Sequence, residues 1–399
     1  MKSSYHETGG RSPGVLLLIC CVIGFVCFFG AYMRIPVLPL FALSLGAGTA
    51  QVGTITAAFM LSAGLLAIPS GLLSDRLGQR TMLLSGLLII SCSSLLIPFS
   101  TGPLVLGVIY LIFGAGLAAF TPTMMSLIAD ISPRDHLGRA YSLYTSAVYA
   151  GMTFGPAAGG LCGRAWGLRE AFLVSGGLVF SAALFSFFFL PRSEPPSPSR
   201  GESPSVRTSL AALMGNNRLK SCLLGTIGGC FGFGMFVTFL PLHARALGLD
   251  PGQIGVIFAA HALANAFLRI PFGRLSDRVD RGNMAAAGLL LFALALAAIG
   301  LCRGFAALMV CAGFLGTGMG FGFTALGALV ADVVSPEERG FALGMYNSCI
   351  YLGMMLSSAT MGHVIHRVGF RSGFLIVGTV VAGMTILFWL RYRQAAARD

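Results

Sequence analysis

The chain has 399 residues, of which 56% are hydrophobic and 10% are charged. A soluble domain carries roughly 25% charged residues, so this composition excludes an ordinary soluble fold. The formal net charge of +12 could indicate nucleic-acid binding, but the basic residues do not gather in one segment. Most of them lie at the chain ends and in alternate loops between apolar runs, so we expect a membrane protein with no nucleic-acid partner.

Twelve apolar runs follow one another along the chain, and each is long enough to cross about 30 Å of hydrocarbon. Because a backbone in lipid must satisfy its own hydrogen bonds, each run predicts a helix. The predicted spans are residues 15–43, 51–73, 81–99, 104–129, 138–163, 170–190, 219–244, 253–275, 283–301, 305–331, 341–365 and 371–391.

The second half of the chain repeats the first half at a shift of 202 positions. Residues 38–76 align with residues 240–278 without a gap, and both segments end in Ser-Asp-Arg. A repeat of this length in an apolar chain predicts two related helix bundles with a binding site between them. We therefore predict an all-α membrane protein with twelve transmembrane helices in two pseudo-symmetric six-helix bundles.

The bundles are expected to be residues 1–190 and residues 218–399. Residues 191–217 lie between them and are rich in Pro and Ser, which predicts an extended or disordered linker. Since Lys and Arg are enriched in the even-numbered loops and at both ends, the positive-inside rule places both termini and the linker in the cytoplasm. We expect a multi-pass protein of the cell inner membrane whose first helix is retained rather than cleaved.

A charged motif follows the second predicted helix and recurs after the eighth. The first copy reads GLLSDRLGQR from Gly71 to Arg80, and the second reads GRLSDR from Gly273 to Arg278. Here the chain resembles the major facilitator superfamily, over essentially its whole length. That superfamily's signature in this loop is G-x-L-x-D-R-x-G-x-R. The resemblance implies a secondary transporter with a clasp on its cytoplasmic side.

The predicted clasp joins these motifs to the ends of neighbouring helices. The two glycines would allow close helix approach, and the motif carboxylates could cap a facing helix N-terminus. The motif arginines could pair with the carboxylates that end the fourth and tenth runs; alternatively, all these charges only fix topology. The expected gate residues are Gly71, Asp75, Arg76, Arg80, Asp130, Arg269, Gly273, Asp277, Arg278 and Asp332.

The fifth predicted helix carries small residues at successive turns. Its core is similar to the antiporter signature of the 12-helix drug:proton antiporters, which also share the Pro-Val-Leu-Pro pattern of residues 36–39. Such a face could be merely structural, since small residues allow tight helix packing. One departure concerns an arginine that the family often carries in the fourth helix, because Tyr110 stands in its place here. The signature residues are Gly151, Gly155, Pro156, Gly159 and Gly160.

The repeat identifies polar residues that the scaffold alone does not require. His261, Asn265 and Arg269 share one face of the eighth helix and align with apolar residues of the first half, and Arg34 aligns with Phe236. Because a charge at the membrane centre costs roughly 2.5–3.5 kcal/mol, such residues usually face a cavity or a partner. Arg34 and Arg269 could instead snorkel, and His261 could simply bond another helix. The predicted cavity residues are Tyr32, Arg34, Tyr110, Phe236, His261 and Asn265.

No Asp or Glu lies in the middle of any predicted helix. A cavity that contains Arg34 without a carboxylate favours an anionic or neutral amphipathic solute. If protons drive transport, His261 is the best candidate carrier, because histidine titrates near physiological pH. The ten cysteines lack metal-like spacing, so we expect no metal and no cofactor.

The sequence thus predicts a monomeric, proton-coupled exporter of a small solute, embedded in the lipid bilayer. An importer or facilitator of a small organic anion or sugar is a first alternative, since the same fold supports both directions. A sensor that uses the transporter fold without flux is a second. An enzyme is not expected, because no catalytic constellation is recognisable in the sequence.

Overall fold

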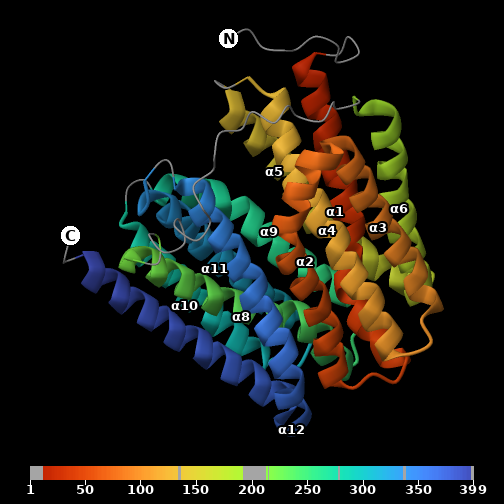
Figure 1. The fold of residues 1–399 in the computed structure, drawn as a ribbon. Coiled ribbons are helices and arrows are strands. Elements are labelled where there is room, and N and C mark those ends of the chain that lie inside the picture. The colour runs from red at the N-terminus through yellow and green to blue at the C-terminus, as the bar shows by residue number, and fades with distance from the viewer. Residues whose placement is uncertain are drawn as a thin grey trace.

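The computed structural model describes residues 12–133, 136–191, 213, 215–276, 279–335 and 338–396 (Figure 1). These residues form long α-helices and one short 3₁₀-helix, with no strand among them. The elements are α1 (Pro13–Ser44), α2 (Thr49–Leu77), α3 (Gln79–Leu96), η1 (Ile97–Phe99), α4 (Pro103–Ile131), α5 (Leu137–Ala165), α6 (Leu168–Phe189), α8 (Asn217–Ala246), α9 (Pro251–Ser276), α10 (Arg281–Ile299), α11 (Phe305–Asp332) and α12 (Arg339–Ala396).

Each predicted run lies mainly within a helix, and three pass a helix end: 81–99 continues into η1, 170–190 passes the end of α6, and 283–301 passes the end of α10. The eleventh and twelfth runs share α12, which is interrupted at Gly369 by a positive φ of 78°. Gly167 separates α5 from α6 with a φ of 121°, and the repeat places it opposite Gly369. Both turns therefore use the residue type that tolerates positive φ.

Ten helices of the described chain are long and apolar enough to cross a membrane. The prediction of twelve spans differs in two places: α12 combines two runs, and α5 is not among the ten. The reason for the second difference is visible in the sequence of α5, which is rich in Gly, Ser, Thr and Tyr. Its composition suits packing between helices better than contact with lipid.

The helices pack as two groups. α1 packs against α5 and α6, and α4 against α2 and α3, while α8 packs against α12 and α11 against α9 and α10. One apolar core lies within the first group and includes Phe120, and another lies within the second and includes Leu289. A third core combines both groups, with Phe41 of α1 and Phe239 of α8 among its members.

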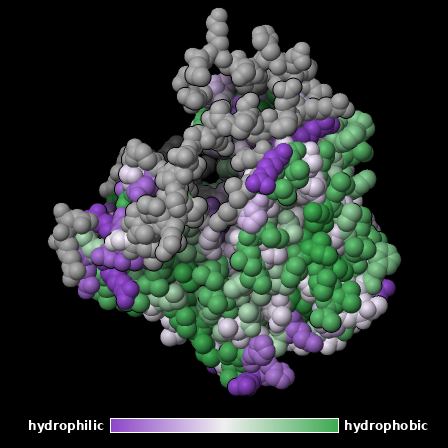
Figure 2. All heavy atoms as spheres, in the orientation of Figure 1, coloured by the Kyte–Doolittle hydropathy of each residue, from purple (hydrophilic) through white to green (hydrophobic). Residues whose placement is uncertain are grey.

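The two groups meet at one end of the molecule and diverge toward the other (Figure 1). We call these the closed end, which carries the α1–α2 and α5–α6 turns, and the open end, which carries the start of α1. The groups touch through α2 with α12, α5 with α9, and α1 with α8. A hollow is visible between them toward the open end (Figure 2).

The flanks of both groups are apolar in the view of Figure 2, whereas hydrophilic side chains gather near the ends. Large apolar side chains point outward on several helices; Leu65, Phe188, Phe267 and Leu294 are examples. Such a surface suits hydrocarbon rather than water. The predicted linker falls largely outside the described residues, which omit 192–212 and 214.

Candidate functional site

The closed end is built from two equivalent helix contacts. A Cβ added at Gly255 of α9 would lie 2.8 Å from the Pro156 carbonyl oxygen of α5, and one added at Gly53 of α2 would meet the Ser358 carbonyl of α12. The repeat relates these two contacts to each other. Next to the second contact, the Thr49 hydroxyl donates to the Gly362 carbonyl at 3.0 Å. Backbone approach this close requires glycine, so the sequence brings the two groups together at defined points.

The predicted antiporter signature forms part of this assembly. A Cβ at Gly151 or Gly155 would lie 2.6 Å from a carbonyl oxygen of α1, those of Phe25 and Phe29 respectively, and Gly159 lies against Met33. Gly160 instead faces Pro251 and Gly255 of α9, in the other group. One face of α5 therefore fixes α1, and its end forms the contact between the two groups.

Arg34 is buried with 1% of its surface exposed. Its guanidinium carbon lies 3.3 Å from the centre of the Phe113 ring and 5.7 Å from that of Tyr110. Nε donates to the Ala31 carbonyl at 3.3 Å, whereas both terminal nitrogens are buried and no residue in the described part of the chain bonds them. Phe59 closes the cluster, with its ring centre 6.0 Å from that of Tyr110. The cluster is a buried cation on aromatic faces with four N–H donors unused.

His261 is also buried, at 5% exposure, and belongs to the other group. Its ring centre lies 4.9 Å from that of Phe236 and 5.7 Å from that of Phe233. The ring is adjacent to the backbone of Ala312, and Nδ1 is buried without a hydrogen-bond partner among the described residues. One ring nitrogen of His261 therefore has hydrogen-bonding capacity that no described residue uses.

The repeat places the Arg34 and His261 clusters at corresponding positions of the two halves, although the residue types at those positions differ. Arg34 aligns with Phe236, and Phe59 aligns with His261. Each group thus contains one polar and one aromatic side chain at this pair of positions, in opposite order. The structure therefore brings together four of the predicted cavity residues in two related clusters: Arg34, Tyr110, Phe236 and His261.

The remaining predicted cavity residues lie between helices. Asn265 is half-buried against Gly320 of α11, whose added Cβ would lie 3.2 Å from the Asn265 side-chain oxygen. Tyr32 is half-buried beside Gly155, and its ring centre is 6.1 Å from that of Phe28. α9 includes Arg269, whose side chain lies outside the described part of the structure.

Asp130, at the end of α4, and Asp332, at the end of α11, both have described partners that the sequence did not predict, and the predicted partner Arg278 lies outside the described residues. The Gln79 amide, not Arg80, donates to Asp130 at 2.6 Å, and the Arg281 guanidinium pairs with Asp332. Arg80 instead donates to the Phe187 carbonyl and lies over the Phe187 ring. The cause is helix phase: Gln79 begins α3, and each further residue turns the side chain by about 100°.

The other predicted gate residues are not among the described contacts of Asp130 and Asp332. Arg76 is exposed and forms no hydrogen bond or ion pair with a described residue. No described atom lies within 4 Å of a Cβ built at Gly71, and the side chains of residues 269–278 lie outside the described part of the structure. Asp277, Arg278 and the side chain of Asp75 lie outside the described residues, and Gly273 belongs to α9.

Sequence reasoning missed Gln79, Arg281 and Phe113. The first two carried a usable signal, because the repeat aligns Gln79 with Arg281 and Asp130 with Asp332. A contact conserved between the halves in this way was available without coordinates. Phe113 carried no comparable signal, since one apolar residue of α4 resembles the others.

Comparison with known proteins supports the architecture. The sequence profile described as the Major Facilitator Superfamily matches residues 20–250 and 222–399. Multidrug resistance protein 2 of Bacillus subtilis is 23% identical over the whole of both chains, and the quinolone resistance protein NorA of Staphylococcus aureus is 22% identical over 94% of this chain and 96% of its own.

A solved bacterial homologue of the human lysosomal transporter Spinster has the same fold. It superposes with a TM-score of 0.82 at 17% identity and covers 96% of this chain and 98% of its own. The profile match, the apolar helices and the duplicated motif agree with one another. The chain belongs to the Major Facilitator Superfamily and is a multi-pass membrane transporter that resembles the drug-efflux members of that family.

Proposed function

We propose that the protein exports a small amphipathic solute, neutral or anionic, in exchange for protons. The observation that carries this proposal is the unpaired guanidinium of Arg34. It is buried with two terminal nitrogens unsatisfied, and no Asp or Glu is found among the buried residues of the described chain. An unpaired buried cation is costly, and an anionic ligand group would relieve that cost.

Aromatic side chains around both clusters suit the apolar part of such a solute. Phe59, Tyr110 and Phe113 surround Arg34, and Phe233 and Phe236 flank His261. Aromatic walls bind flat or branched apolar groups without strong selectivity. The names of the relatives, a multidrug resistance protein and a quinolone resistance protein, favour export over import.

His261 is the proposed proton carrier. Phe233, Phe236 and the backbone of Ala312 lie beside its ring, and no charged side chain is among these neighbours. Protonation of His261 would add a second positive charge to the one at Arg34 and so increase the attraction of the two clusters for an anionic solute. In this proposal Arg34 is a fixed positive charge and His261 is a switchable one.

The proposed motion is a rocking of the two six-helix bundles, residues 1–190 and 218–399, about this site. The linker 191–217 and both termini are assigned to the cytoplasm, so the closed end faces outward and the open end inward. The protein is proposed to act as a monomer in the cell inner membrane, without catalytic activity. Each half carries one polar cluster, so relative motion of the halves changes the distance between them.

Flux measurements in proteoliposomes test the proposal. An outward proton-coupled exporter concentrates an anionic or neutral amphipathic dye against its gradient when a pH gradient is imposed, and it does not do so without that gradient. Loss of the gene should raise the internal concentration of the solute; a fall would favour the importer. Dye binding without any flux would favour the sensor.

A further inference from the structure

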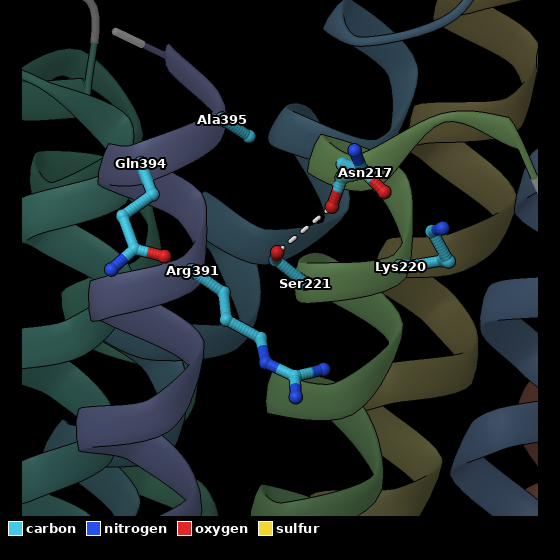
Figure 3. Close-up of a pocket in the computed structure, with 6 residues that line it drawn as sticks. All are labelled: Asn217, Lys220, Ser221, Arg391, Gln394 and Ala395. Atoms are coloured by element: carbon cyan, nitrogen blue, oxygen red, sulfur yellow. Dashed lines mark hydrogen bonds between the residues drawn. The ribbon is translucent and has the colours of Figure 1, made fainter. Parts of the chain in front are cut away.

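A second polar pocket lies far from the Arg34 and His261 clusters, at the open end of the molecule. It is about 250 Å³ in volume, which is much larger than the ~10–15 Å³ that one water molecule needs. It lies between the first turns of α8 and the last turns of α12 (Figure 3). The lining residues are Asn217, Lys220, Ser221, Arg391, Gln394 and Ala395.

The pocket is positively charged. Lys220 and Arg391 are its two ionised residues, and no acidic side chain is among those that line it. The Arg391 guanidinium extends from α12 toward α8 (Figure 3), and neither cation forms an ion pair with any residue the structure describes. The positive end of the α8 dipole lies at the same place, because α8 begins at Asn217.

Uncharged donors complete the polar wall. The amides of Asn217 and Gln394 are exposed at the pocket, whereas the Ser221 hydroxyl is already committed to the Asn217 carbonyl at 2.8 Å. Two cations and two amides offer many N–H donors with few competing acceptors. This donor set suits a phosphate or phosphodiester group.

Apolar side chains continue from the donors along α12. Ile386 and Leu390 precede Gln394 at helical spacing and are 50% and 44% exposed, and Leu387 stands four residues before Arg391 at 41%. Residues four apart share a helix face, so the donors stand directly above an outward-facing apolar stripe. A free phosphate ion would make no use of that stripe, whereas the acyl chains of a lipid would.

The depth of the pocket agrees with this arrangement. Trp389 lies two residues before Arg391 and donates its indole N–H to the Asn283 side chain at 2.8 Å. Tryptophan with a satisfied N–H is typical of the membrane–water interface. The pocket is therefore at headgroup depth, with the apolar stripe on its membrane side.

From this geometry we infer that the pocket between α8 and α12 binds the phosphate of an anionic phospholipid from the leaflet at the open end. The headgroup contacts Lys220, Arg391 and the two amides, and an acyl chain lies along Ile386, Leu387 and Leu390. Basic pockets between transmembrane helices bind anionic lipids by this combination of charge and depth. Since α8 directly follows the linker, a bound lipid would tie the start of the second half to the bilayer.

Native mass spectrometry of the full-length protein tests this assignment. Purified protein is titrated with phosphatidylglycerol or with phosphatidylcholine of the same chains, and lipid adducts are counted. Wild type should retain more phosphatidylglycerol than phosphatidylcholine, and Arg391→Gln should lower this preference about fivefold. The double variant, which adds Lys220→Gln, should lose a similar factor again. The matched control is Arg393→Gln, which removes a positive charge from the same helix. Arg393 stacks on Trp389 and does not line the pocket.

Several results would overturn the assignment. These are equal retention of the two lipids by wild type, an undiminished preference in the double variant, or equal losses in the Arg393 control. Displacement of the lipid by inorganic phosphate would identify a free-anion site instead. If the double variant does not fold, Arg391→Lys decides: it should keep the preference, and loss of preference in that folded variant would contradict a charge-based site.

Discussion

Arg34 is buried and forms no ion pair with a carboxylate among the residues the structure describes. Stacking on Phe113 and Tyr110 returns about 0.5–2 kcal/mol, while unsatisfied buried groups cost about 1–3 kcal/mol each. On these magnitudes, a buried guanidinium lowers stability unless a further polar group bonds it. A side chain that lowers stability in this way is expected where a ligand supplies the missing partner.

Replacement of this residue should separate stability from function. Arg34→Met is expected to raise the melting temperature of the purified protein by a few degrees, because it removes unpaired buried N–H groups. The same variant should lose transport of anionic solutes about tenfold or more, while neutral solutes are affected less. A fall in melting temperature would show that Arg34 has a structural partner, and Arg34→Lys serves as the charge-retaining control.

Phe59 of the first half aligns with His261 of the second half. The variant His261→Phe therefore gives both halves the same residue at this position. Because the site is aromatic on both sides, the variant should fold with a melting temperature near that of wild type. Solute efflux in the variant should no longer respond to the imposed pH gradient. Efflux that still follows the gradient would remove His261 from proton coupling.

At the scale of helices, the closed end depends on glycine contacts between α5 and α9 and between α2 and α12. Gly255→Leu would force its side chain against the Pro156 carbonyl, so it should weaken closure at this end. Thiol reagents added from outside should then label cysteines introduced near the site faster than in wild type. The control is Gly177→Leu, because nothing lies within 4 Å of a Cβ at that position.

The contacts of Asp130 and Asp332 provide a comparison between the halves. The first half uses Gln79 where the second half uses Arg281, so the fold accepts an amide at this position. Arg281→Gln should therefore lower the free energy of unfolding by no more than about 1 kcal/mol, as expected for an exposed ion pair. A much larger loss in a denaturation or thermal-shift series would show that the two contacts are not equivalent.

The helices were predictable because each one has to cross the same thickness of hydrocarbon. The site was predictable only in part. Comparison of the halves identified Arg34 and His261, since a polar residue opposite an aromatic one is not required by a shared scaffold. It could not show that Arg34 stacks on Phe113, or that Gln79 rather than Arg80 meets Asp130. Both outcomes depend on helix phase and side-chain direction, which apolar periodicity in a membrane helix does not define.

For the whole molecule, the duplicated sequence produces duplicated contacts. The α5–α9 contact and the α2–α12 contact are repeats of each other, and together they hold one end shut while the other diverges (Figure 1). These glycine contacts lie beside an apolar core that the two halves share, with Phe41 and Phe239 among its members. Two rigid halves joined in this way can exchange which end is closed.

The two halves are proposed to rock about the Arg34 and His261 clusters, and distances between paired spin labels measure that motion. One pair, at Arg76 and Arg339, would report the open end, and another, at Gly48 and His366, the closed end, on a background without native cysteines. Under a pH gradient with an exported solute, the first distance should shorten while the second lengthens. Two distances that stay fixed during measured flux, or that change in the same direction, would contradict the account.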